Sequence, residues 1–228
     1  MNSRSLSFEE GQDVLDWTAD SKRVLISLVR NDHYTLRLQS LNLGTQTTIV
    51  ASAPGSTEYA AVSPDENWVI ALVTPTPGKV AKAFQVMRFP ISGGSPELIF
   101  TMAEWSSPFC AKRPSRLCAV AEQSSDHKQM VITSLDPIQG RGSELARLDV
   151  SPEFKMHDMG LLWDISLDGT RIAMAPGPEG PIEISSLGGG PRQLIYPKDV
   201  TKMRELQWAA DGKGLFIDNY TNVARNVL

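Results

Sequence analysis

Cysteine and histidine are scarce in this chain of 228 residues, which has two of the first and three of the second. Two cysteines cannot make a disulfide framework, and His33, His127 and His157 lack the spacing of zinc ligands. We therefore expect no metal and no other cofactor. The motifs G-x-S-x-G and H-E-x-x-H, which mark hydrolases and metalloproteases, are absent as well. The sequence predicts a chain that is not an enzyme.

A strong charge of one sign and long apolar runs are also missing. The formal net charge is −4, whereas a nucleic-acid-binding surface needs a basic excess. Polar residues interrupt every apolar run before it reaches membrane-spanning length, and the first ten residues, MNSRSLSFEE, lack the pattern of a signal peptide. We expect no nucleic-acid partner and no membrane-spanning segment in this stretch. The compartment stays open.

What the sequence does contain is an internal repeat. Four segments share an apolar residue, an aspartate, a turn-forming residue and then a strand of alternating apolar residues. They are WTADSKRVLISL (17–28), VSPDENWVIALV (62–73), ISLDGTRIAMAP (165–176) and WAADGKGLFID (208–218). A weaker copy at 110–121 has Arg113 where the others have aspartate. The copies recur roughly every 45 residues, which is the period of a four-stranded propeller blade.

The repeated aspartates are interpreted as structural. They are Asp20, Asp65, Asp168 and Asp211. An aspartate at the start of a turn accepts hydrogen bonds from backbone N–H groups two residues on. One aspartate per blade also keeps the four far apart, whereas acid–base pairs and calcium sites need oxygens within a few ångströms. We expect a positive φ at the next position, where the units have Ser21, Glu66, Gly169 and Gly212.

A second element, strand–glycine turn–strand, recurs later in each unit. Its clearest copies are QVMRFPISGGSPELIF (85–100) and IEISSLGGGPRQLIY (182–196). Each unit therefore holds four short strands, and no segment shows a capped helical pattern. The sequence predicts an all-β fold, a β-propeller of four-stranded antiparallel blades, with four complete or near-complete blades and part of a fifth.

We expect a single domain over 1–228, incomplete at both ends, as a piece of a propeller of six to eight blades. The alternative is that residues 3–8 complete the fifth blade and close a five-bladed ring. Its units are expected at about 14–50, 57–100, 106–148, 159–196 and 203–228. Trp17, Val62, Ile165 and Trp208 stand at one position of the repeat. Trp163 lies two residues before Ile165 and so points to the same face of its strand. Trp17, Trp163 and Trp208 are expected to pack in the core.

The W-x-x-D-[GS]-K turn, paired with the later S-x-G-G-x-P-x-x-L turn, resembles the blade repeat of TolB-like, WD-repeat-like propellers, over about residues 14–218. This resemblance implies a non-catalytic interaction or sensory module within a larger bacterial protein. Such propellers are similar to those of envelope proteins, or are appended to a Ser/Thr kinase or a winged-helix regulator. The alternative is the propeller gating domain of a prolyl-oligopeptidase-like serine hydrolase, whose catalytic domain would lie outside this sequence.

Binding is expected on one face of the propeller, which we call the loop face. It carries the connections between second and third strands and those between units, and variable loops on a rigid scaffold are the usual binding surface. A protein or a small ligand would contact it through candidate residues His33, Lys79, Lys82, Trp105, His127 and His157. The aspartate and glycine turns lie on the opposite face, the turn face.

Cys110 and Cys118 flank Pro114 symmetrically in the third unit. If a hairpin centres there, the two residues lie opposite each other on adjacent antiparallel strands, where a disulfide can form. Two buried free cysteines are the other interpretation. The side chains are neighbours in both.

Overall fold

The computed structural model describes residues 12–31, 33–41, 47–54, 56–74, 84–103, 106–150, 162–177, 179–198, 200, 202–219 and 226–227. In these ranges the regular structure is entirely β, and the strands form five antiparallel sheets. Each sheet consists of strands that follow one another in the chain. None of the described segments is a helix long and apolar enough to cross a membrane.

Four of the sheets have four strands. The first holds β1 (Gln12–Trp17), β2 (Arg23–Arg30), β3 (His33–Ser40) and β4 (Thr47–Pro54). The second holds β5 (Ser56–Val62), β6 (Trp68–Thr74), β7 (Phe84–Pro90) and β8 (Glu97–Met102). The third holds β9 (Phe109–Cys110), β10 (Cys118–Gln123), β11 (Gln129–Asp136) and β12 (Gly140–Asp149). The fourth holds β13 (Leu162–Ile165), β14 (Arg171–Ala175), β15 (Ile182–Ser186) and β16 (Gln193–Ile195).

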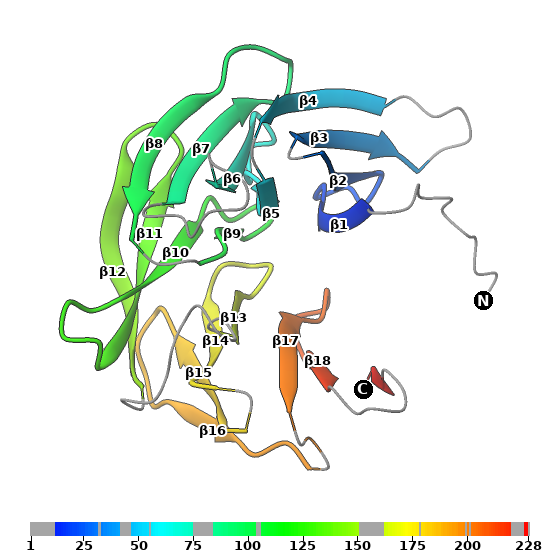
Figure 1. The fold of residues 1–228 in the computed structure, drawn as a ribbon. Coiled ribbons are helices and arrows are strands. Elements are labelled where there is room, and N and C mark those ends of the chain that lie inside the picture. Colours follow the sequence, from blue (N-terminus) through cyan, green and yellow to red (C-terminus); the bar gives the residue numbers. More distant parts are fainter. Residues whose placement is uncertain are drawn as a thin grey trace.

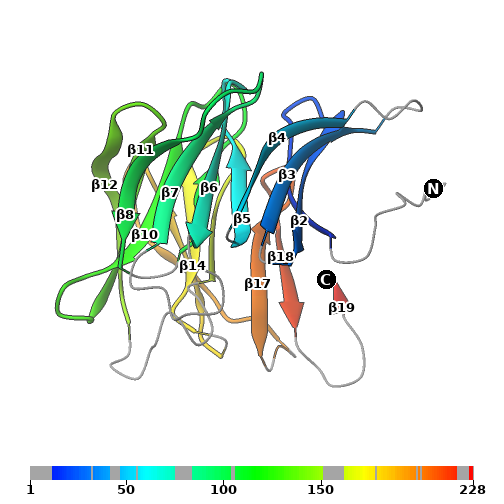
Figure 2. The ribbon, with the colours of Figure 1, turned by 45° about the horizontal axis from the view of Figure 1, so that its top comes forward.

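The fifth sheet is partial, with β17 (Met203–Trp208), β18 (Leu215–Asn219) and β19 (Asn226–Val227). Figure 1 shows the five sheets side by side around an arc, with the first strand of each nearest the centre. The strands run along a broadly common direction in Figure 2, so their connections gather at two faces. The predicted propeller of four blades and part of a fifth is confirmed. The single domain and its unit boundaries stay predictions.

The core lies in layers between consecutive sheets. The middle strands read as continuous apolar runs because both of their faces are covered; Val69 to Val73 of β6, for example, are all buried. Leu25 of the first sheet packs with Val62 and Phe89 of the second. Equivalent layers join the second sheet to the third, the third to the fourth, and the fourth to the fifth.

From the second sheet to the fifth, the last residue of the innermost strand packs against the preceding sheet. Val62, Ile165 and Trp208 are 1%, 2% and 7% exposed at this position. Trp17 is 44% exposed, so its predicted place in the core is wrong. The physical reason is that Trp17 belongs to the first sheet of the arc, where no described sheet precedes it. Trp163 is buried as expected, with its ring 4.9 Å from that of Phe109.

Candidate functional site

The repeated aspartates shape the turns between first and second strands. Asp65 accepts hydrogen bonds from the Ser63 hydroxyl at 2.5 Å and the Asn67 backbone N–H at 3.1 Å. Asp20, Asp168 and Asp211 accept the N–H two residues on in the same way. Hydrogen bonds from Ser166 and Thr170 hold the pKa of Asp168 below its usual value. Each of these carboxylates is engaged within its own turn.

The residue after each of these aspartates has a positive φ, as the repeat predicted. The angle is 55° at Ser21, 59° at Glu66, 69° at Gly169 and 66° at Gly212. Ser21 and Glu66 adopt it despite their side chains, so the turn geometry outweighs the local preference of the residue.

The loop face carries one further aspartate turn of this kind, which the sequence repeat did not predict. Asp126, between β10 and β11, accepts hydrogen bonds from the Ser124 hydroxyl at 2.6 Å and the Lys128 N–H at 3.2 Å. The signal was the Ser-x-Asp pattern, which also occurs at 63–65 and 166–168. His127 occupies the positive-φ position, at 58°, and its Nδ1 lies 3.1 Å from the Gln123 Oε1.

The structure describes two of the six residues expected on the loop face. His33 is the first residue of β3, where it is exposed and places its Nε2 3.1 Å from the Ser52 hydroxyl. His127 is held in the turn just described. Lys79, Lys82, Trp105 and His157 lie outside the described residues. A binding site on the loop face therefore stays a prediction.

Cys110 and Cys118 form a disulfide across the hairpin of β9 and β10. They are directly paired in the ladder with their Cα atoms 4.0 Å apart, which confirms that the two side chains are neighbours. The bridge closes the base of the turn that carries Arg113 and Arg116. The sequence left open whether the two cysteines form a disulfide or are buried and free, and the disulfide is the correct interpretation.

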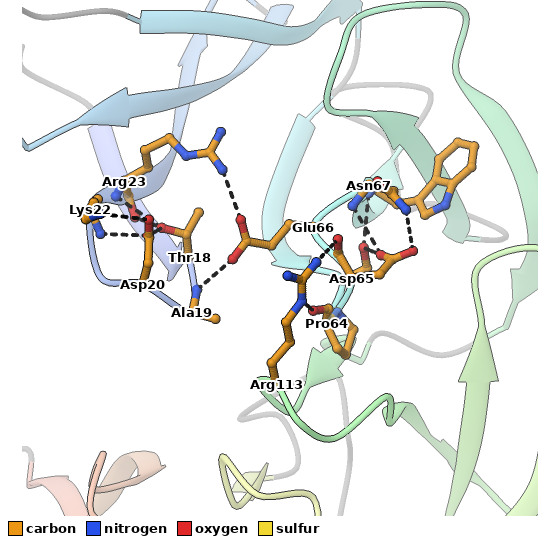
Figure 3. Close-up of polar contacts among 12 residues, drawn as sticks. Thr18, Ala19, Asp20, Lys22, Arg23, Pro64, Asp65, Glu66, Asn67 and Arg113 are labelled. Carbon is orange, nitrogen blue, oxygen red and sulfur yellow. Dashed lines mark hydrogen bonds and ion pairs between the residues drawn. The ribbon is translucent and has the colours of Figure 1, made fainter.

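Arg113, which replaces the turn aspartate, joins the third sheet to the second. Its guanidinium donates to the backbone carbonyls of Pro64, at 2.9 Å, and Asp65 (Figure 3). Glu66 joins the second sheet to the first in a similar way. Its carboxylate accepts the Ala19 N–H at 3.1 Å and pairs with Arg23 at 3.0 Å (Figure 3). On the turn face, contacts between turns therefore link the first three sheets to one another.

A groove of about 770 Å³ opens on the turn face between the second and third sheets. One wall is the β5–β6 turn, with Pro64, Asp65 and Trp68; the other is formed by the β9–β10 and β11–β12 turns. The second wall presents Arg113, Pro114, Ser115, Arg116, Asp136, Pro137 and Ile138. We call this the turn-face groove. The repeat pattern in the sequence pointed to the opposite face as the binding surface and did not indicate this groove.

Arg88 of β7 ties the two walls together. Its guanidinium carbon lies 5.0 Å from the centre of the Trp68 ring, and it donates to the Pro137 carbonyl at 2.7 Å. The same guanidinium pairs with Glu97. These contacts fix the position of Trp68 and of the β11–β12 turn before any ligand arrives.

Charged side chains also meet near the centre of the arc. Asp16 and Asp164 stand four residues before Asp20 and Asp168, and each bridges two sheets. Each aspartate accepts the backbone N–H of the next residue through one carboxylate oxygen. With the other oxygen, Asp16 accepts the Val62 N–H at 2.8 Å and Asp164 accepts the Trp208 N–H at 2.7 Å.

Lys112 completes this central group. Its Nζ lies 2.8 and 2.6 Å from the two oxygens of Asp16. Burial raises the pKa of Asp164 to about 7, opposed by the N–H groups of Trp208 and Ile165. No three His, Cys, Asp or Glu side chains cluster as a metal site in the part of the chain that the structure describes.

No protein-family model and no curated protein matches the chain. Among solved structures, the chain is similar to TolB from Acinetobacter baumannii, with a TM-score of 0.66 and 13% sequence identity. The match covers 92% of this chain and 49% of the TolB chain. An oligogalacturonate lyase in complex with manganese covers 90% of this chain and 60% of its own, with a TM-score of 0.62 and 14% identity.

The β-propeller domain of Cps50 (Swd1) from Myceliophteria thermophila covers 90% of this chain and 79% of its own, with a TM-score of 0.53 and 10% identity. The chain spans about half the length of the TolB that it matches. At these identities the likeness shows the fold alone. That fold is a β-propeller of the TolB-like, WD-repeat-like kind, as the sequence repeat predicted.

Proposed function

We propose that this propeller is a non-catalytic interaction module, which binds a partner protein through its surface. The turn-face groove is the observation that carries the proposal. Its volume of about 770 Å³ lies in the range of ligand sites, and its walls are held in place by contacts between sheets. The aspartates of the repeat cap their own turns, which leaves them poorly suited to acid–base chemistry.

The module is proposed to be part of a larger bacterial regulator or envelope protein. The repeat of the TolB-like kind supports this context. The loop face with His33 and His127 is a second candidate surface. A gating role beside a serine hydrolase domain is the alternative, and a flanking G-x-S-x-G domain would favour it.

A site-specific photo-crosslinker distinguishes the two faces. Benzoylphenylalanine is placed at Ile138 in the turn-face groove, at His33 or His127 on the loop face, and at Leu194 as the control. Leu194 is the middle residue of the outer strand β16, away from both faces, and is 51% exposed against 70% for Ile138. After irradiation in the cells of origin, crosslinked products are separated and identified by mass spectrometry.

We expect one discrete protein product from Ile138 and none from Leu194. Products from His33 or His127 alone would move the binding surface to the loop face. If no position gives a specific product, or if the purified chain hydrolyses a substrate and loses that activity on a single substitution, the proposal is wrong.

A further inference from the structure

We infer that the turn-face groove binds an acidic, extended peptide segment of a partner protein. In this inference, which rests on the proposed function, carboxylates of the segment pair with Arg113 and Arg116. Its apolar side chains lie against Trp68, Pro114 and Ile138.

The hydrogen-bonding groups of the groove favour an acidic ligand. Arg113 donates only to neutral backbone carbonyls, and no described carboxylate forms an ion pair with it. Arg116 is exposed and makes no hydrogen bond or ion pair with a described residue. A guanidinium with free N–H groups binds a carboxylate through two parallel hydrogen bonds.

The two acids of the groove are engaged elsewhere. Asp65 accepts from Ser63 and twice from Asn67, so its oxygens are occupied within the β5–β6 turn. Asp136 accepts the N–H groups of Ile138 at 2.7 Å and Gln139 at 2.8 Å, both through Oδ1, and its Oδ2 has no hydrogen-bond partner among the described residues. The hydrogen-bond donors left to meet a ligand are those of the two arginines, which outnumber this one carboxylate oxygen.

Apolar surface completes the groove and favours a peptide over a free anion. Ile138 is 70% exposed at one rim, and Pro114 is exposed opposite Trp68. Aromatic side chains and arginines are the residues that most often dominate the binding energy of a protein interface. A segment that alternates acidic and apolar residues would satisfy both kinds of wall.

The walls are organised before binding, which lowers the entropy cost of association. The Cys110–Cys118 disulfide closes the hairpin that carries Arg113 and Arg116. On the other wall, the Trp68 N–H donates to the Ser63 hydroxyl at 3.0 Å, and Arg88 covers the Trp68 ring.

The test uses the full chain and a fluorescein-labelled peptide, Glu-Leu-Glu-Ala-Asp-Phe-Glu-Leu, in fluorescence anisotropy. A second peptide replaces every acid by its amide. We expect the acidic peptide to bind about tenfold more tightly than the amide peptide, and to lose affinity as salt is raised. Arg116→Glu should weaken binding of the acidic peptide by about tenfold or more, because attraction becomes repulsion.

Arg204→Glu is the matched control, since Arg204 on β17 is also exposed and unpartnered among the described residues, and lies outside the groove. It should change the affinity by less than about twofold. Arg116→Gln gives a second, milder variant, and circular dichroism checks that each variant is folded. Equal binding of the two peptides, no binding of the acidic peptide, or equal losses in Arg116→Glu and Arg204→Glu would overturn the inference.

The two proposals fail separately. If Ile138 crosslinks a partner whose binding is insensitive to Arg116→Glu, the module still binds but its ligand is not acidic. If no partner crosslinks, the proposed function itself fails.

Discussion

Asp164 holds a carboxyl group in a poorly solvated place between the fourth and fifth sheets. Burial raises its pKa to about 7 in the folded chain, from an ordinary value of 3.8. Between these two values the folded chain keeps a proton that the unfolded chain has lost. The free energy of unfolding therefore falls as the pH rises through this window, and is level above it.

Asp164→Asn should remove that fall. The two carboxylate oxygens each accept one N–H, from Ile165 and from Trp208, and the amide oxygen can keep only one of these hydrogen bonds. The variant should therefore be less stable at every pH, but its side chain cannot ionise. We expect the wild type to lose on the order of 3 kcal/mol between pH 5 and pH 8 through this group, and the variant to lose little. Urea denaturation at both pH values measures the difference.

Asp168→Asn serves as the control, because hydrogen bonds lower the pKa of Asp168 and its titration lies below pH 5. It should leave the fall between pH 5 and pH 8 unchanged. An identical pH profile for the wild type and Asp164→Asn would contradict the role given to Asp164.

At the scale of elements, the turns at Gly169 and Gly212 differ in what lies beside them. Both glycines occupy the same turn position, with φ of 69° and 66°. A Cβ at Gly169 would collide with the Ser115 side chain of the third sheet, whereas one at Gly212 would lie 3.4 Å from the flexible end of Arg171. The turn at Gly169 therefore packs closely against the third sheet, whereas the turn at Gly212 has space for a Cβ atom.

Gly169→Ala should therefore destabilise the chain by about 2 kcal/mol more than Gly212→Ala. The strain of a positive φ is common to both variants, so the difference reports the collision with Ser115 together with a close approach of 3.2 Å to the Ala111 Cβ. Guanidinium denaturation of the two variants and of Gly169→Ala/Ser115→Gly measures it. Equal losses, or no recovery in the double variant, would show that the contact is unimportant.

The β9–β10 hairpin depends on its disulfide in the same local way. The cysteines are eight positions apart, and closing so short a loop is worth about 2–3 kcal/mol in the chain-entropy model. Cys110→Ala/Cys118→Ala should lose about that much stability, and a reductant should have the same effect on the wild type but none on the variant. A wild type that is indifferent to reductant at equilibrium would contradict this.

The hairpins were predictable because each depends on its own sequence. Asp65 and its neighbours within five residues make the whole turn, so the pattern that encodes it can be read locally. The Asp126 turn carried the same Ser-x-Asp signal and could have been found. The groove could not be predicted, because its walls come from two sheets. Arg113 in particular donates to backbone carbonyls that lie some fifty residues away in the chain. The exposure of Trp17 likewise depends on what lies beside the first sheet.

At the scale of the whole molecule, Lys112 pairs with a sheet that is not its neighbour. It belongs to the turn after β9 of the third sheet, and Asp16 belongs to the first. Both side chains are largely buried, at 14% and 18% exposure. Removing one partner of such a pair leaves the other charge uncompensated.

Lys112→Met should lower the free energy of unfolding by about 2–3 kcal/mol. Lys22→Met is the control, since Lys22 is 69% exposed and lies 4.0 Å from Asp20; it should change stability by less than about 0.5 kcal/mol. Similar losses in the two variants, measured in urea, would rule out a special role for the central pair.

The same pair bears on how cooperatively the propeller unfolds. A repeat array in which each unit contacts only its neighbours behaves as a one-dimensional chain, which can lose units from one end while the rest persists. The ion pair joins the first sheet directly to the third, and we expect it to make the amide protons of these two sheets exchange together rather than in sequence. In Lys112→Met that coupling is gone, and hydrogen exchange should then show the first sheet opening at a lower free energy than the third.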